Sequence, residues 1–182
     1  MYLNRKITTF LLSLLFFFQI TAKEMNFNNL ISSENNWEFI SDQVMGGISF
    51  GKKEFLHKED IPFMRMTGYV SLENNGGFIQ VRHKLKTELQ EVNGLKIRVR
   101  GNDKNYKIHI RTKYTILPWQ YYSATFHANE DWKLINFKLT EFARSGKLLP
   151  KNIKSKHISS VAVVAFGQEY RATIDISDLE FY

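Results

Sequence analysis

The chain contains no cysteine and only three prolines among its 182 residues. Without cysteine it has no disulfide, no thiolate metal site, no cysteine nucleophile and no cysteine to which a lipid could be attached after a leader. The common catalytic signatures are also missing, since we find no G-x-S-x-G, no P-loop, no G-x-G-x-x-G and no H-E-x-x-H motif. The sequence therefore points away from the usual enzyme classes.

Metal and nucleic-acid sites are not indicated either. The five histidines lie on separate segments, without the short spacings of a zinc site. Acidic pairs such as Glu130-Asp131 are typical of turns. Tyr106 alternates with basic residues and so points to the opposite face from them, unlike a nucleic-acid stacking platform, which presents both together. We expect no catalytic residue, no metal, no cofactor and no nucleic-acid partner.

Long apolar runs are scarce, with one exception at the N-terminus. Arg5 and Lys6 precede an apolar run over residues 7–20, and Thr21-Ala22 then offer a small residue for cleavage. This pattern predicts a secretory signal peptide over residues 1–22, with an uncleaved anchor as the alternative. Removing the leader would lower the net charge from +7 to +5. We therefore expect an exported protein, periplasmic or secreted, whose residues 23–182 form a single domain.

Aromatic residues are abundant, and apolar and polar residues alternate along most of the chain. Eight segments show this period of two and predict strands, namely 67–73, 78–85, 94–100, 105–114, 119–127, 132–139, 159–166 and 171–182. Their spacing near ten residues is typical of an all-β sandwich or barrel. Helical periodicity is scarce, so we expect at most two short helices, one of them capped by Thr140.

Two glycine-containing turns predict hairpins. Around Asn75-Gly76, a hairpin register would set Leu72 against Ile79 on an apolar face. A second hairpin over residues 95–113 would set Arg98 against Lys107 on a basic face, where like charges repel. We define the predicted basic face by its outward cations, which are Arg82, Lys96, Arg98, Lys107, His109 and Arg111. Either neighbouring acids offset this charge, or the face binds an anionic partner.

Four stretches of the sequence resemble one known family. They are WEFISDQVMGGIS (37–49), GYVSLENNGGFIQVR (68–82), GLKIRVRGNDKNY (94–106) and WKLINF (132–137). They are similar to the complex I intermediate-associated protein 30 family, and the resemblance runs collinearly from Trp37 to the end of the chain. It implies a jelly-roll β-sandwich of the galactose-binding-like kind, without known catalytic residues or cofactor. Mitochondrial members of the family assist complex I assembly.

The first glycine pair follows an acidic residue. Asp42 can accept hydrogen bonds from the amides of a following turn. Gly46 and Gly47 would then permit a bulge where Val44 and Met45 enter the core. The alternative is a site at the rim of the sandwich, formed by Asp42, Gly46 and Gly47.

Two functions are consistent with these features of the sequence. The first is a non-catalytic, assembly-factor-like domain that binds a protein partner through the predicted basic face, such as an assembly intermediate of a membrane complex. The second is an exported carbohydrate-binding module of the jelly-roll type. Its sugar platform would be built from Trp119, Tyr121 and Tyr122, because aromatic rings commonly stack on sugars in such modules.

Overall fold

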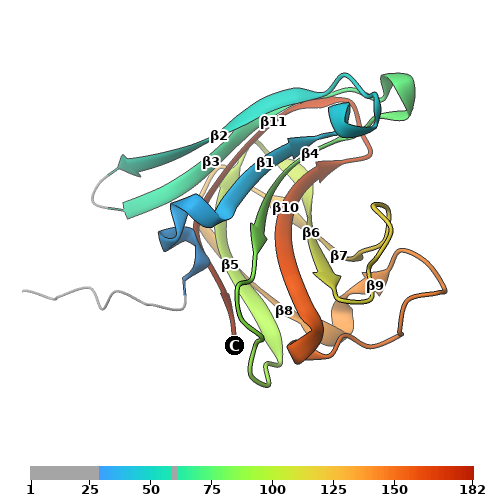
Figure 1. The fold of residues 1–182 in the computed structure, drawn as a ribbon. Helices are drawn as coiled ribbons and strands as arrows, with labels where there is room; N and C mark the ends of the chain where they lie inside the picture. The colour runs from blue at the N-terminus through green and yellow to red at the C-terminus, as the bar shows by residue number, and fades with distance from the viewer. Residues whose placement is uncertain (1–28, 59–60) are drawn as a thin grey trace, which may run out of the picture.

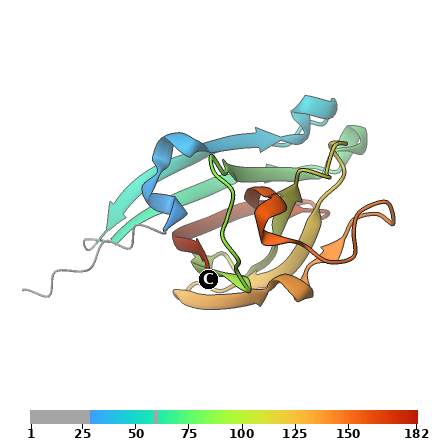
Figure 2. The same ribbon diagram turned by 60° about the horizontal axis from the view of Figure 1, so that its bottom comes forward.

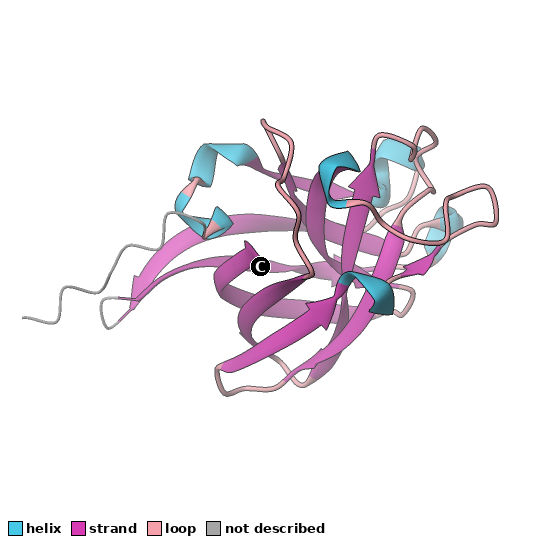
Figure 3. Cartoon of the chain, turned by 90° about the horizontal axis from the view of Figure 1, so that it is seen from below, coloured by secondary structure: helices cyan, strands magenta, loops and turns pink. Residues whose placement is uncertain are grey.

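The computed structural model describes residues 29–58 and 61–182. The predicted leader over residues 1–22 lies outside the described residues. Strands make up most of the structure, and short helical turns are confined to its periphery (Figure 3). The described part of the chain holds no α-helix, and none of its helical turns has the length and apolar character needed to span a bilayer.

The strands form two antiparallel sheets that pack face to face (Figure 1). The six-stranded sheet has the order β1-β4-β10-β6-β7-β9, with β1 at Trp37–Ser41, β4 at Phe78–Lys84, β10 at Ile158–Phe166, β6 at Lys104–Thr112, β7 at Tyr122–Ala128 and β9 at Ala143–Arg144. The five-stranded sheet has the order β2-β3-β11-β5-β8, with β2 at Phe50–Lys58, β3 at Ile61–Val70, β11 at Tyr170–Phe181, β5 at Gly94–Gly101 and β8 at Lys133–Lys138. This two-layer arrangement is the predicted jelly-roll sandwich.

The core lies between the two sheets and follows from the alternation of apolar residues. Successive side chains of a strand point to opposite faces, so every second residue of each central strand is buried. The six-stranded sheet contributes residues such as Val81, Ile108 and Val163, and the five-stranded sheet contributes residues such as Ile97 and Ile174, all fully buried. The intervening residues of each strand form the outer faces.

Both predicted hairpins are wrong. β3 and β4 lie in different sheets, as do β5 and β6, so the turns at Asn75-Gly76 and at 101–103 carry the chain from one sheet to the other. β4 pairs with β1 and β10, while β6 pairs with β10 and β7. Apolar side chains from two opposed sheets meet in the same core as those of a hairpin would. The alternation pattern alone therefore could not distinguish the two arrangements.

Short 3-10 turns replace the expected helices. They lie at Leu30–Ser32 (η2), Glu34–Asn36 (η3), Asp42–Met45 (η4), Glu73–Asn75 (η5), Leu139–Glu141 (η6) and Ser155–His157 (η7). The predicted helix near Thr140 is the single turn η6, where the Glu141 carboxylate accepts a 2.8 Å hydrogen bond from the Lys138 amide. At one end of the sandwich, the long β4–β5 loop passes beside the C-terminus (Figure 2), and the Asn93 and Gly94 amides both donate to the Tyr182 carbonyl there.

Candidate functional site

A cleft of about 570 Å³ lies on the outer face of the six-stranded sheet. We call it the outer cleft. Its floor comes from β1, β4, β10 and β6, which lie side by side in Figure 1. Three connecting segments complete its lining, namely the turn η4 with Val44 and Met45, the turn η5 with Asn75 and the following Gly76, and the loop after β6 with Pro118 and Trp119. The site therefore combines a sheet with three connecting segments.

The register of the sheet places the floor residues in rows. One row runs across the strands through Glu38, Arg82, Ala162 and His109. The next runs through Ile40, Gln80, Val164 and Lys107. On the central strand β10 the outward residues are Ser160, Ala162 and Val164, which are smaller than the side chains on either side of them. The face is consequently hollow along β10, with long polar side chains on both flanks.

Aromatic rings line this hollow. Trp119 is 64% exposed, so most of this residue is open to solvent at the end of the cleft. Tyr121 stacks on His109 with 3.9 Å between ring centroids and 10° between planes. Phe166 packs against the edge of this stacked pair, and Phe78 lines the cleft on β4. Exposed aromatic rings beside hydrogen-bonding side chains suit a ligand that has both apolar faces and hydroxyl groups.

One cation of the cleft is paired with an acid. Arg82 Nε donates a 2.6 Å hydrogen bond to Glu38 Oε1, and Lys84 Nζ lies 3.4 Å from the same oxygen. Burial raises the pKa of Glu38, but the hydrogen bonds and charges of Arg82 and Lys84 outweigh burial and leave that pKa lowered. Glu38 is therefore ionised near neutral pH and orients Arg82 on the floor.

Arg111 holds the Trp119 loop by its backbone. The Arg111 guanidinium donates to the carbonyl oxygens of Thr115, Leu117 and Pro118 at 2.9, 2.9 and 3.1 Å. Beyond them, the Ser145 hydroxyl donates to the Trp119 carbonyl at 3.0 Å. Burial, followed by the charge of Arg82, lowers the pKa of Arg111. The Trp119 ring is thus exposed on a loop whose backbone is fixed, which reduces the entropy lost on binding.

His109 has a structural part in the cleft floor. Burial, reinforced by the charges of Lys107 and Arg111, lowers the pKa of His109 to about 3. The ring is therefore neutral at physiological pH. It supports the Tyr121 ring by stacking and contributes no charge to the cleft.

The predicted rim site at Asp42, Gly46 and Gly47 forms a tight turn at the end of the cleft. Asp42 is fully buried, and its carboxylate accepts hydrogen bonds from the Ser49 amide and hydroxyl and from the amides of Gly77 and Phe78. These bonds satisfy the carboxylate within the protein, so its role is structural. Gly46 ends η4 with φ of +89°, a left-handed conformation that favours glycine.

The expected burial of two residues in this turn is wrong. Val44 is 72% exposed and Met45 is 56% exposed, and both line the outer cleft and stay out of the core. The turn η4 reverses the chain at the end of β1 and directs these side chains outward. Asp42, Gly46 and Gly47 themselves are not among the residues that line the outer cleft, so a binding site formed by these three residues stays a prediction.

The structure divides the predicted basic face between two sheets. Arg82, Lys107, His109 and Arg111 lie on the six-stranded sheet, and all but Lys107 line the outer cleft directly. Lys96 and Arg98 lie on β5 of the other sheet, beside strand β11, which carries Asp178 and Glu180. Arg98 lies opposite Asp178 in register, and Lys96 forms an ion pair with Glu180. The continuous basic face built on a β5–β6 hairpin is therefore wrong.

The predicted sugar platform is also divided. Trp119 and Tyr121 line the outer cleft. Tyr122 points the other way, because successive residues of a strand alternate, and it is only 1% exposed. Its hydroxyl donates to the Pro150 carbonyl at 2.9 Å. A platform of all three rings is thus wrong, and Phe166 and Phe78 take the place of Tyr122 in the cleft.

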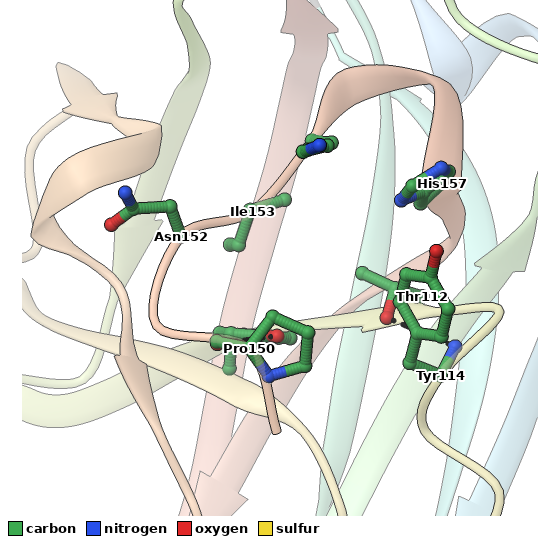
Figure 4. A pocket seen from close by; sticks show the side chains of 8 residues that line it. Thr112, Tyr114, Pro150, Asn152, Ile153 and His157 are labelled. Carbon is green, nitrogen blue, oxygen red and sulfur yellow. Dashed lines mark hydrogen bonds between the residues drawn. The ribbon is translucent and has the colours of Figure 1, made fainter.

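A second, smaller pocket of about 200 Å³ is lined in part by Tyr122, and Figure 4 shows this pocket from close by. Its walls include Tyr114, Pro150, Ile153 and His157. The Tyr114 and His157 rings already meet edge to face at 4.8 Å. This pocket is a weaker candidate, because it is smaller and its lining groups mostly contact one another.

Sequence analysis missed several residues of the outer cleft. Ile40, Gln80, Ser160 and Phe166 gave no signal, because each occupies an ordinary outward position of an alternating strand. Only the strand order brings them together. Among the described residues, no group of three His, Asp or Glu side chains is arranged to hold a metal ion.

Comparisons with known proteins agree with this architecture. The sequence profile described as Complex I intermediate-associated protein 30 matches residues 25–175. No curated protein matches the sequence significantly.

Several solved structures have a fold similar to that of this chain, although their sequences differ from it. The family 11 carbohydrate-binding module of the cellulosomal cellulase Lic26A-Cel5E of Clostridium thermocellum superposes with a TM-score of 0.66 at 10% identity, over 80% of this chain and 86% of that one. A structure of a family 11 module from the same organism in complex with a β-1,3-1,4-mixed-linked tetrasaccharide gives 0.65 at 11% identity, over 80% and 88%. A family 30 carbohydrate-binding module gives 0.55 at 12% identity, over 75% and 91%. At these identities the likeness shows the fold alone.

Proposed function

The chain belongs to the complex I intermediate-associated protein 30 family, and from the geometry of its outer cleft we propose that it is a non-catalytic binding domain that takes a carbohydrate chain there. The observation that carries this proposal is the combination of exposed and stacked aromatic rings with hydrogen-bonding side chains along one hollow sheet face. Trp119 and Tyr121 provide apolar surfaces, while Gln80, Arg82 and Glu38 can hydrogen-bond to hydroxyl groups.

The size and rigidity of the cleft support an extended ligand. A volume of about 570 Å³ is within the range of small-molecule sites. The floor is a hydrogen-bonded sheet, and the Trp119 loop is held by Arg111, so the site is preformed. The fold likeness to carbohydrate-binding modules, one of them solved with a bound tetrasaccharide, supports the proposal by analogy.

The absence of catalysis is part of the proposal. Asp42, a buried acid in the turn η4, uses its carboxylate oxygens on the protein's own amides and on the Ser49 hydroxyl. Glu38 is paired with Arg82. A glycosidase needs two carboxyl groups that face each other across the scissile bond. In the part of the outer cleft that the structure describes, Glu38 is the one acid in the lining.

A second candidate is the binding of a protein partner, such as an assembly intermediate of a membrane complex. The family description supports it. A structural feature does so too, because Val44, Met45, Ile48 and Phe50 are all more than two-fifths exposed around the turn at the end of β1. Large exposed apolar side chains gathered in one place are typical of protein contacts. Export through the predicted leader would place either partner outside the cytoplasm.

Glycan binding tests the proposed function. The protein, expressed from the full chain, would be screened by affinity electrophoresis and calorimetry against soluble polysaccharides. We expect binding that Trp119→Ala weakens by at least about tenfold, as loss of an exposed aromatic anchor does. Trp132→Ala is the matched control, because Trp132 packs against Phe63 and Arg100 on the other sheet.

The same experiment separates the two candidates. Binding that survives Trp119→Ala unchanged would remove the outer cleft as a glycan site. If no polysaccharide binds, while a defined protein partner is captured and released by Met45→Glu, the protein-binding candidate would replace the carbohydrate one.

A further inference from the structure

The cations on the two outer faces of the sandwich differ in whether they have acidic partners. On the five-stranded sheet, Asp175 accepts hydrogen bonds from both Arg65 and Arg100. Lys96 on β5 forms an ion pair with Glu180, which lies on β11 as Asp175 does. Strand β11 thus brings an acid into contact with each of these three cations.

The outer cleft is not balanced in this way. Arg82, Lys107 and Arg111 stand on or beside its floor, and Glu38 is the one carboxylate that pairs with any of them among residues 29–58 and 61–182. Arg111 has carbonyl partners, which carry no net charge. The Lys107 ammonium lies 4.7 Å from the centre of the Phe166 ring, again without an acid. The cleft and its edge therefore carry two positive charges in excess, one on Arg111 in the lining and one on Lys107 beside it.

The two cations that have no acidic partner among the described residues, Lys107 and Arg111, lie beside aromatic rings. Lys107 rests on Phe166, and Arg111 anchors the loop of Trp119, so each uncompensated cation stands next to a ring that could stack on a sugar. A neutral glycan would leave these charges unpaired. A glycan with carboxylate or sulfate groups would supply the missing anions and keep the stacking.

We propose that the ligand of the outer cleft is an acidic polysaccharide, one that carries uronic-acid or sulfate groups. This inference rests on the proposed carbohydrate-binding function and specifies its ligand class. Arg82 and Gln80 hydrogen-bond to the chain, the rings of Trp119 and Tyr121 stack on it, and Lys107 and Arg111 meet its anionic groups.

The test compares polysaccharides that differ only in charge. Polygalacturonate and its highly methyl-esterified form share a backbone, so esterification removes the carboxylate charge alone. Hyaluronan, alginate and chondroitin sulfate extend the acidic set, and mixed-linked β-glucan is a neutral reference. We expect the acidic chains to bind at least about tenfold more tightly than the neutral ones, with affinity falling as salt is raised.

Variants locate the effect. Lys107→Gln should weaken binding of an acidic chain by roughly three- to fivefold and so reduce the difference in affinity between acidic and neutral chains, as expected for one partly exposed ion pair. Lys133→Gln is the matched control, since Lys133 is an exposed lysine on β8 of the other sheet, and it should have no effect.

Each other outcome has a separate meaning. Equal binding of neutral and acidic chains would overturn this inference and leave the proposed function standing. Absence of binding to every polysaccharide would overturn both. Polyglutamate binding as tightly as polygalacturonate would show that the cleft recognises acidic chains without regard to sugar, which would also overturn the inference.

Discussion

The amide of Gly77 donates a 2.6 Å hydrogen bond to the carboxylate of Asp42, thirty-five residues earlier in the chain. This bond connects the second glycine pair, Gly76-Gly77, to the turn that precedes the first pair, Gly46-Gly47. A Cβ atom on Gly47 would lie 2.3 Å from Asp42 Cγ, and one on Gly76 would lie 2.4 Å from Asp42 Oδ2. One glycine of each pair is therefore needed to make room for a single buried carboxylate, which ties the end of β1 to the start of β4.

Asp42→Asn should lower the free energy of unfolding by about 2–3 kcal/mol near pH 7, because an amide cannot accept all the hydrogen bonds that the buried carboxylate accepts. Chemical denaturation measures this difference. Asp131→Asn is the control, since Asp131 is an exposed acid in a loop and its substitution should change stability by less than about 0.5 kcal/mol.

The effect of Asp42→Asn should depend on pH. Burial raises the pKa of Asp42, but its hydrogen bonds outweigh burial and leave that pKa below the ordinary value of 3.8. A lowered folded-state pKa stabilises the fold above that ordinary value, and the stabilisation is lost as pH falls through the folded-state pKa. The difference in the free energy of unfolding between the wild-type protein and Asp42→Asn should therefore become smaller below about pH 4. A constant difference down to pH 2 would contradict this role for Asp42.

Gly47→Ala should destabilise the protein by about 1–3 kcal/mol, since Asp42 is fixed by its hydrogen bonds and cannot move away from a new methyl group. Gly146→Ala is the matched control, because no atom lies within 4 Å of its would-be Cβ and its φ is not positive. Thermal unfolding of the two variants compares them. Equal melting temperatures would show that the space at Gly47 is not needed.

Asp175→Asn should destabilise the fold by about 2–4 kcal/mol, because it removes a buried acid that serves two arginines. Its carboxylate is 4% exposed and receives Arg65 Nε at 2.6 Å and Arg100 Nε at 2.8 Å. Glu38→Gln breaks the comparable pair with Arg82, but Glu38 is 39% exposed, so that loss should stay within about 1 kcal/mol. Urea unfolding of both variants measures the two losses of stability. A larger loss for Glu38→Gln than for Asp175→Asn would refute the stabilising role of Asp175.

His109 should make stability fall in mild acid. Because burial lowers its pKa to about 3, the unfolded chain takes up a proton that the folded chain does not as pH falls below about 6.5. The resulting loss should reach up to about 2 kcal/mol at pH 5. His109→Phe keeps a ring against Tyr121 and should reduce the slope of stability against pH between 7 and 5.

A control and a remaining contribution complete that prediction. His57→Phe, at an exposed position, should leave the slope unchanged. Burial also lowers the pKa of His83, so some slope should persist in His109→Phe. A variant with the full wild-type slope would contradict the burial of a neutral imidazole at position 109.

The sequence predicted the fold class and most strand positions, because burial of every second residue leaves a strong alternation. It failed on which strands are neighbours. Leu95, Ile97 and Val99 face the core from one sheet, and Tyr106 and Ile108 face it from the other. A hairpin would place the same residues on one face. Local pattern is identical in the two arrangements, and only long-range pairing separates them.

The candidate site was predicted in part for the same reason. Trp119 and Tyr121 were identified because aromatic residues are recognisable as possible sugar-stacking groups. Tyr122 was wrongly included, because it follows Tyr121 directly and its side chain therefore points to the opposite face, into the core. Arg82, Lys107 and Arg111 were found as cations, but Lys96 and Arg98 were grouped with them through the wrong hairpin. Gln80 and Phe166 were not found, because the cleft exists only where β4, β10 and β6 lie together.

The central claim is that the outer face of the six-stranded sheet is the ligand site. Nuclear magnetic resonance titration of the ¹⁵N-labelled protein with an oligogalacturonate tests it most directly. We predict that amide shifts change on β4, β10 and β6 and in the loop of Trp119, and that β5 and β8 stay unperturbed. Changes confined to the five-stranded sheet, or no change at saturating oligosaccharide, would contradict the account.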